Sequence, residues 1–310
     1  MANYSGDNEE EKGFFNKNKL VSLMIIVSCV LFVFVFFVEK TKIFVEMVPT
    51  LRGEVSLENG FSITTINNRY PILIKKDDPI VGNRLRFSGD IKSLFSEVSI
   101  FLAPRSGVIV EVGSHFGYNV INIAKKLGES SKYYAFEPNA GVFSCLKKSV
   151  FLNDIEKVVI LRSTALSDSE TSIPIEDCLS MSSESSTSRA KPRMIVVGSS
   201  TVDKELENEP TPVSLLLIDV PGSEFSVIKG AQKIIENSQD IKIVMSFDRE
   251  NSIKNSDIGF ELQRLKNLGF NFYLISSFEK FRMISAEEIM SEDDGVLVMT
   301  RNKNFNLSSF

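Results

Sequence analysis

The sequence predicts an α/β fold in which a mostly parallel sheet carries helices on both faces. Short apolar runs that suit buried strands alternate along the chain with stretches of helical periodicity. These runs are almost continuously aliphatic, as strands covered on both faces are. The composition, 43% hydrophobic and 24% charged over 310 residues, is that of a globular protein with a large core and excludes a disordered chain.

The first strand and helix are the clearest pair. Val108–Val112 is a short apolar run that leads into a glycine. Apolar residues then recur at helical spacing, at Val120, Ile123, Ala124 and Leu127. Gly128 stands where a helix commonly ends.

Further apolar runs predict the remaining strands: Tyr133–Phe136, Val158–Leu161, Val213–Ile218, Ile241–Met245, Phe270–Leu274 and Gly295–Met299. The last two suit antiparallel pairing. Helices are predicted between them over 143–150, 225–235 and 258–265. The stretch between the third and fourth strands is long, and its low-complexity run Ser180–Ser188 is expected to be a surface loop.

Charge and rare residues exclude several classes of site. Lys and Arg number 35 against 40 Asp and Glu, so the chain has no basic footprint for nucleic acid. His115 is the one histidine, which excludes metal sites that need two, and no metal site is predicted. The three cysteines form no C-x-x-C and no disulfide framework.

Leu20–Val38 is an uncharged apolar run of 19 residues, long enough to span a bilayer as a helix. A cleaved signal peptide and a buried core helix are the alternatives, but no small-residue cleavage site follows. We therefore expect a single-pass membrane localisation with the lipid bilayer as a partner. Lysines on both sides leave the orientation and the identity of the membrane undetermined, although a short tail suits a cytosolic N-terminus.

This run divides the chain into predicted parts. They are a tail over 1–19, the anchor over 20–38, a stem and N-terminal extension over 39–85, and the main α/β domain over 86–310.

A glycine-rich turn follows the first strand in Glu111-Val-Gly113-Ser-His-Phe-Gly117. Ligands of open α/β sheets bind beyond the carboxyl ends of strands, and glycine allows close approach to the backbone. The spacing is G-x-x-x-G and not the G-x-G-x-x-G of dinucleotide sites. This difference argues against NAD or FAD, although a plain strand–helix turn remains an alternative.

The second strand ends at Glu137, 24 residues after Gly113. A carboxylate in this place can accept hydrogen bonds from both hydroxyls of a ribose. Alone it is more typical of a solvated turn or a helix cap. Together with the glycine turn it favours a nucleoside cofactor without a phosphate to cradle, S-adenosyl-L-methionine.

Five motifs in this order resemble the FkbM-type methyltransferases over about 108–274: VEVGSHFGYN, YAFEPN, FLND at 151–154, SSTVD at 199–203 and LLLIDVPGSEFSVIKGA at 215–231. The resemblance implies the class I methyltransferase (Rossmann-like) fold, with a seven-stranded sheet whose last strand is antiparallel. It also implies S-adenosylmethionine-dependent O-methylation of a hydroxyl, often on a sugar or natural product.

The resemblance also implies roles for individual residues. Glu111, Gly113 and Gly117 would border the methionine part of the cofactor, and Glu137 would hold its ribose. Asp168 would lie near the adenine side. Asp219, Gly222 and Glu224 match the family's second signature after the fourth strand.

Several positions depart from the family pattern. Glu111 replaces the usual Asp, and Ser114-His115 replaces a small residue followed by Asn. Leu217 and Pro221 replace a Lys and a Glu, and Ser246 stands about where a Glu commonly ends the fifth strand. The alternative function is therefore a catalytically divergent protein of this fold that serves as a membrane-surface binding module.

Methyl transfer to an unactivated hydroxyl needs the acceptor aligned and its proton removed. Asp219, at the end of the central strand, is the best-placed catalytic group, with a helix N-cap as its alternative. Glu224 suits a catalytic role or compensation of a helix dipole. His115 has the chemistry of a base, but a turn residue that bonds the backbone is the alternative.

The two carboxylates of Asp219 and Asp248 offer an alternative role as a pair of ligands for Mg²⁺. The leading expectation is thus a membrane-anchored O-methyltransferase for a hydroxyl of a sugar, glycan or lipid-linked or natural-product acceptor. The acceptor and the oligomeric state are not determined by the sequence.

Overall fold

The computed structural model describes residues 53–76, 78, 81–91, 93–177, 179, 193–252, 258–277, 280–292 and 294–305. All of them belong to one compact unit, Arg52–Phe310. The tail predicted over 1–19 and the loop predicted at Ser180–Ser188 lie outside the described residues.

The membrane localisation predicted from the sequence is corrected. No helix among the described residues is both long and apolar enough to cross a membrane. The run Leu20–Val38, on which that prediction rested, lies outside the described part of the chain.

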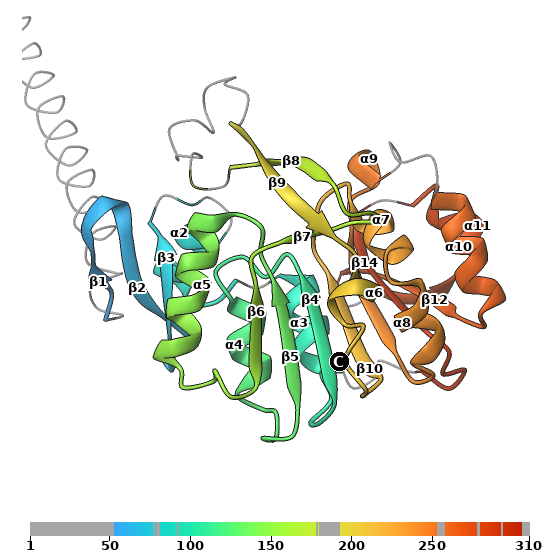
Figure 1. Cartoon of the computed structure of the whole chain (residues 1–310), viewed down its shortest axis with the longest axis horizontal. Coiled ribbons are helices and arrows are strands. Elements are labelled where there is room, and N and C mark those ends of the chain that lie inside the picture. The colour runs from blue at the N-terminus through green and yellow to red at the C-terminus, as the bar shows by residue number, and fades with distance from the viewer. Residues whose placement is uncertain are drawn as a thin grey trace, which may run out of the picture. The chain divides into compact units, whose positions relative to one another are not determined.

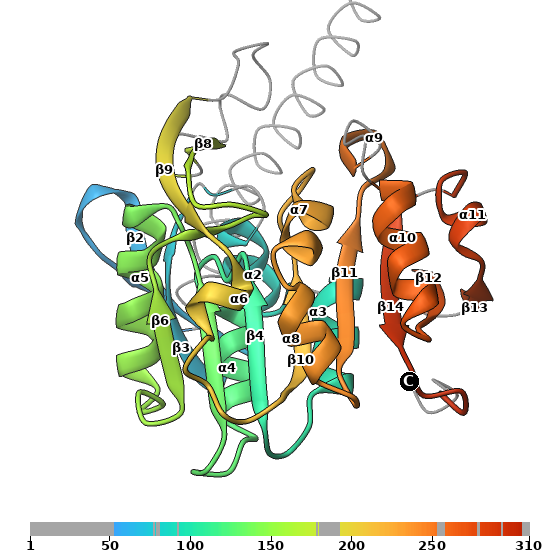
Figure 2. The ribbon, with the colours of Figure 1, turned by 45° about the vertical axis from the view of Figure 1, so that its right-hand side comes forward.

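The main sheet has the order β13-β12-β14-β11-β10-β4-β5-β6 (Figures 1 and 2). The strands from β11 to β6 pair in parallel, and β14 runs antiparallel to both of its neighbours. The bounds are β4 Val108–Val112, β5 Lys132–Phe136, β6 Val159–Arg162, β10 Val213–Ile218, β11 Lys242–Phe247, β12 Asn271–Ser277, β13 Lys280–Ile284 and β14 Gly295–Thr300.

Helices cover both faces of this sheet, and each face has its own apolar core. One core contains residues of α2 (Gly82–Ser88), α3 (Leu94–Leu102), α4 (Tyr118–Ala124) and α5 (Ala140–Leu152). The other contains residues of α6 (Val202–Glu205), α7 (Glu224–Lys229), α8 (Gln232–Asn237), α10 (Ile258–Asn267) and α11 (Ala286–Ile289). The two-face α/β fold predicted from the strand–helix alternation is confirmed. The short helix α9 (Arg249–Ser252) follows β11.

The sheet differs from the prediction in its number of strands. β13 adds an eighth strand at the edge, antiparallel to β12, where seven were expected. Its sequence, KFRMI, alternates polar and apolar residues over only its first four positions, a weak signal for an edge strand.

The helix predicted over 225–235 is two helices, α7 and α8, separated at Gly230-Ala231. A Cβ at Gly230 would stand 2.0 Å from the carbonyl oxygen of Ser167. The break therefore accompanies close packing of another segment against the backbone.

The N-terminal part of the described chain folds against the domain. It contains β1 (Val55–Ser56), the 3₁₀ turn Glu58–Gly60, β2 (Phe61–Ile66) and β3 (Tyr70–Lys75), paired as an antiparallel sheet. The backbone N–H of Leu73 donates to Ser149 Oγ of α5 at 3.0 Å, and Asn153 Nδ2 donates to the carbonyl of Pro71 at 2.7 Å. From residue 53 on, the predicted stem and extension is thus part of the packed structure.

A second small sheet of order β7-β9-β8 occupies the stretch between β6 and β10. It is formed by β7 (Ala165–Leu166), β8 (Ser172–Glu176) and β9 (Met194–Ser200). In Figures 1 and 2 the β8–β9 ribbon lies on the side where the parallel strands of the main sheet end.

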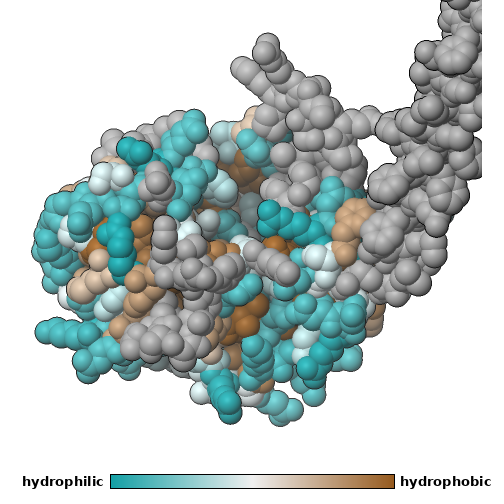
Figure 3. Space-filling view, turned by 180° about the vertical axis from the view of Figure 1, so that it is seen from behind, coloured by the Kyte–Doolittle hydropathy of each residue, from teal (hydrophilic) through white to brown (hydrophobic). Residues whose placement is uncertain are grey.

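The surface is mainly hydrophilic on the face seen in Figure 3, with hydrophobic residues showing in small areas between polar ones. Large exposed apolar side chains include Phe151, Val196, Phe260 and Met283, which lie on different elements. Scattered residues of this kind are usual on protein surfaces.

Candidate functional site

The candidate site lies at the carboxyl edge of the main sheet, where four neighbouring parallel strands end in register. Val112 is paired with Phe136 and Ile218, and Ile218 is paired with Met245. The residue that directly follows each of these four paired residues belongs to the site. These residues are Gly113, Glu137, Asp219 and Ser246.

Gly113 and Gly117 shape the turn above β4. Both have positive φ, +90° and +95°, which a residue with a side chain rarely adopts. A Cβ at Gly113 would stand 2.3 Å from the carbonyl oxygen of Asp219, and one at Gly117 would stand 2.6 Å from Leu146. Glycine at these two positions thus lets Asp219 and Leu146 pack directly against the turn, and the role of both glycines beside the methionine part of the cofactor stays a prediction.

Glu137 joins the loops that follow β4 and β5. Its Oε2 accepts a hydrogen bond from the backbone N–H of His115 at 3.0 Å, and its Oε1 accepts one from Asn139 at 2.8 Å. Burial raises the pKa of Glu137 to about 7, and these two backbone bonds oppose the rise. Each carboxylate oxygen retains a lone pair for a further donor.

Glu111 lies one row below the edge, on β4, and is only 1% exposed. Its two oxygens accept hydrogen bonds from Asn119 Nδ2 and from the Tyr133 hydroxyl, both at 2.9 Å. Burial raises its pKa to about 7 despite these bonds. Glu111 thus ties β4 to α4 and β5 from within the core.

Asp219 is exposed where β10 ends, and its backbone N–H donates to Val112 at 3.0 Å. The protein packed around it raises the pKa of its carboxyl group, and a hydrogen bond from the Ser246 side chain opposes the rise. Although the residue is exposed, the protein atoms around it remove part of the hydration of its carboxyl group. As an exposed residue, Asp219 is available to a ligand at this edge.

His115 lies in the turn between the two glycines with a φ of +48°, in the left-handed region that histidine tolerates better than most residues. Its Nε2 lies 3.8 Å from Oδ2 of Asp78, a residue of the N-terminal part. Both ring nitrogens are buried and have no hydrogen-bond partner among the residues that the structure describes.

Two other predicted site residues are engaged elsewhere. Glu224 is 1% exposed in the first turn of α7, and its Oε1 accepts from the N–H of Gly222 at 3.0 Å. Asp168 is exposed and pairs with Lys229 at 3.1 Å, and the hydrogen bond from that lysine lowers its pKa. The Asp168 carboxylate contacts Lys229 of α7 and the neighbouring side chains of Ser167 and Ser169.

Several residues at or beneath the site were missed by the sequence analysis. They are Asp78, Asn119, Tyr133 and Asn139. Asn139 follows the Glu-Pro signal and caps α5, accepting from Gly141 and Val142 at 3.0 and 3.2 Å, so a capping pattern could have found it. The others depend on contacts distant in sequence, for which the sequence contains no local signal.

Within the described residues no group of three or more His, Cys, Asp or Glu side chains could hold a metal ion. The pairing of Asp219 with Asp248 for Mg²⁺ therefore gains no third protein ligand there.

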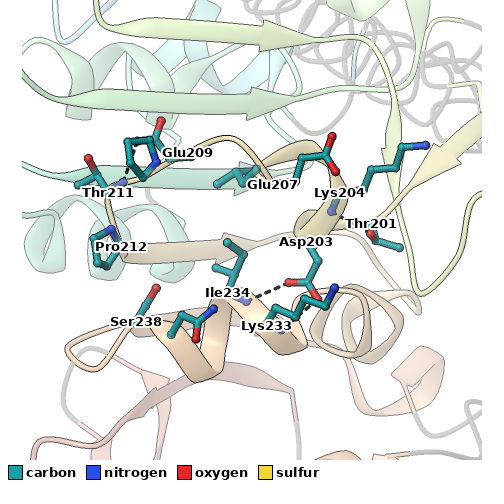
Figure 4. Close-up of a pocket in the computed structure, with 13 residues that line it drawn as sticks. Thr201, Asp203, Lys204, Glu207, Glu209, Thr211, Pro212, Lys233, Ile234 and Ser238 are labelled. Carbon is teal, nitrogen blue, oxygen red and sulfur yellow. Dashed lines mark hydrogen bonds between the residues drawn. The ribbon is translucent and has the colours of Figure 1, made fainter.

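A separate groove of about 600 Å³ lies near the amino end of β10, between α6 and α8 (Figure 4). In Figure 4 the carboxylate of Asp203 points to the start of α8, where it accepts from the backbone N–H of Lys233 at 3.0 Å and of Ile234 at 2.9 Å. Thr201 caps α6 through the N–H of Lys204 at 3.1 Å. The SSTVD motif thus joins α6 to α8.

Comparison with protein families places this architecture in a known group. The Methyltransferase FkbM domain model matches residues 111–272, just over half of the 310 residues. The match includes the glycine turn, Glu137, Asp219 and Ser246. The chain therefore belongs to the FkbM methyltransferase domain family.

No curated protein sequence matches the chain. Among solved structures, it is similar to a methyltransferase FkbM from Methylobacillus flagellatus, at 13% identity and a TM-score of 0.40 over 63% of this chain. This chain covers 44% of that protein, less than half of its length.

Two further solved structures show similarity of the same order. A putative transferase from Pyrococcus horikoshii has 10% identity and a TM-score of 0.44, covering 78% of this chain and 72% of that one. An O-methyltransferase from Bacillus cereus in complex with SAH has 12% identity and a TM-score of 0.39, covering 66% and 78%. The family assignment rests on the domain match and not on these structures.

Proposed function

We propose that this protein is an S-adenosylmethionine-dependent O-methyltransferase that acts on a hydroxyl group of a sugar, glycan or lipid-linked or natural-product acceptor. The observation that carries the proposal is the position of Glu137. It is a buried carboxylate at the end of β5, held by backbone N–H groups of the two loops that frame the sheet edge. A carboxylate in this position suits the two hydroxyls of a ribose.

The residues at the edge fit such a cofactor on two counts. Glu137 has a lone pair left on each oxygen, enough for two hydroxyl donors. The buried ring nitrogens of His115, which lack a partner among the described residues, offer polar contacts that a bound molecule would satisfy. Glu137 and His115 would therefore hold the cofactor, beside the turn built by Gly113 and Gly117.

When bound, the cofactor supplies a methyl group on a positively charged sulfur. The contribution of this chain is to align the acceptor oxygen and to receive its proton. Asp219 suits that role because it is exposed at the end of the central strand and its carbonyl oxygen lies directly against Gly113. The hydrogen bond from Ser246 would orient the Asp219 carboxylate toward an acceptor.

Calorimetry with S-adenosylhomocysteine tests the proposal. The wild-type chain should bind it, and Glu137→Ala should bind it roughly tenfold to a hundredfold more weakly, because charge-assisted hydrogen bonds to the ribose are lost. Circular dichroism should show that the variant is folded.

The matched control is Glu170→Gln, which alters a carboxylate that is 55% exposed and paired with Lys204 on the surface. This variant should bind like the wild type. Absence of binding by the wild-type chain, or equal affinity in Glu137→Ala, would reject the proposed cofactor site.

A further inference from the structure

Asp78 and His115 form an acid–imidazole pair beside the candidate site, with Asp78 buried and the His115 side chain 22% exposed. The carboxylate comes from the segment that precedes α2, and the imidazole comes from the turn after β4, 37 positions later in the sequence. Oδ2 of Asp78 lies 3.8 Å from Nε2 of His115, slightly beyond hydrogen-bond distance. At this distance the carboxylate acts on the ring through its charge, which favours a proton on the nitrogen that faces it.

The carboxylate is held firmly on its other side. Oδ1 of Asp78 accepts hydrogen bonds from the backbone N–H groups of Val81 at 2.6 Å and Gly82 at 3.0 Å, at the start of α2. Asp78 is 1% exposed. One oxygen is thus used to begin a helix, which directs the other oxygen toward His115.

The imidazole is also fixed through its surroundings. The backbone N–H of His115 donates to Glu137, and its ring meets the ring of Phe116 edge-on at 4.2 Å. Burial lowers the pKa of His115, an effect that Asp78 opposes, so the ring is mainly neutral near pH 7. A neutral imidazole carries one proton, and its position decides which nitrogen can accept a hydrogen bond.

We infer that Asp78 is a positioning residue that holds the imidazole proton on Nε2, so that Nδ1 of His115 accepts a hydrogen bond from a donor on the bound cofactor. The donor chemistry is an ammonium or a hydroxyl group, both of which an S-adenosyl compound carries. The inference rests on the proposed function for its ligand. The state of the imidazole without ligand can be measured independently of that function.

The single histidine of the chain makes the test direct. In the full chain labelled with ¹⁵N-histidine, every imidazole nitrogen signal belongs to His115. At neutral pH the wild type should show a protonated Nε2 and an unprotonated Nδ1.

Asp78→Asn should reverse this pattern. The amide oxygen of Asn can still cap α2, because Asn and Asp cap comparably. Its NH₂ group can only donate toward Nε2, so the proton should move to Nδ1. An Nε2 signal identical in wild type and Asp78→Asn would overturn the inference.

Two more variants guard against misfolding and general effects. Asp78→Ser keeps a capping hydroxyl but cannot reach Nε2, so it should give a mixture of the two tautomers. Asp90→Asn alters a different carboxylate of the N-terminal part, one that accepts from the Tyr118 hydroxyl, and should leave both His115 signals unchanged. A shift in Asp90→Asn as large as that in Asp78→Asn would contradict a specific contact.

Two ligands then distinguish the donors. S-adenosylhomocysteine carries an ammonium group, whereas 5′-methylthioadenosine lacks it but keeps the ribose hydroxyls and the adenine amino group that both compounds share. A change of the Nδ1 signal with the first alone indicates the ammonium, and a change with both indicates a donor of the adenosine part. If calorimetry shows binding but neither ligand changes the Nδ1 signal, the role of Nδ1 is refuted. If neither ligand binds, the result counts against the proposed function. The tautomer measurements then still decide the role of Asp78.

Discussion

Glu111 links the protonation of the candidate site to the stability of the fold. Its pKa is raised by burial from 4.5 to about 7. A carboxyl group whose pKa is higher in the folded state binds protons more tightly there, so its contribution to stability falls as the pH rises from about 4.5 to 7. At about 1.4 kcal/mol per pH unit, the fall is on the order of 3 kcal/mol.

Glu111→Gln should remove this dependence. The free energy of unfolding of the variant minus that of the wild type should be larger at pH 8 than at pH 5, by roughly 2–3 kcal/mol. Urea denaturation at both pH values measures the difference. A difference between variant and wild type that stays the same at both pH values would show that Glu111 ionises as an exposed residue does.

Glu209→Gln is the matched control for this measurement. Desolvation alone would raise the pKa of Glu209, but hydrogen bonds from Lys132 and Tyr134 outweigh it and lower the pKa. Glu209 is therefore ionised in both folded and unfolded chains above pH 5. Its replacement should have an effect that does not change between pH 5 and 8.

For single residues, the sequence predicted the positions of the carboxylates better than the identity of their hydrogen-bond partners. Glu111, Glu137 and Asp219 lie on or directly after apolar runs, and strand periodicity was enough to place them near one edge. Tyr133 reads as an ordinary aromatic residue of a strand, because nothing local marks its hydroxyl as the donor to Glu111.

Among the elements, the hairpin β2–β3 depends on helix α5 for its attachment. Ser149 is fully buried, and its Oγ accepts from the backbone N–H of Leu73. Ser149→Ala leaves that donor buried without a partner. The variant should lose about 1–3 kcal/mol of unfolding free energy in urea denaturation.

Ser144→Ala is the corresponding change at an exposed position of the same helix. It should leave stability unchanged or raise it slightly, because alanine is the better helix former. Equal stability of the two variants would mean that the hairpin is not held through Ser149.

The strands that the sequence analysis missed differ in their local signal. β13 and β8 are short edge strands without a continuous apolar run, whereas β9 begins with the apolar run Met194–Val197, which the sequence analysis did not assign to a strand. The start of α7 was predicted within one residue, whereas the break at Gly230 depends on packing against Ser167. Local periodicity therefore identifies the central elements, and tertiary packing determines the rest.

For the whole molecule, the order of strands determines where a ligand can bind. The strands with polar residues at their ends, β4, β5, β10 and β11, are neighbours in the middle of the sheet. The small sheet β7-β9-β8 lies on this side of the molecule (Figure 2). The groove of Figure 4 lies between α6 and α8 and extends to the residues before the amino end of β10, and its Asp203 is already used in joining α6 to α8.

A crystal structure of the full chain with S-adenosylhomocysteine bound tests this account most directly. We predict ribose hydroxyls on the carboxylate of Glu137, with the sulfur turned toward the exposed carboxylate of Asp219. An adenosyl group in the groove lined by Thr201, Asp203 and Lys233, with the carboxyl edge of the sheet empty, would contradict it.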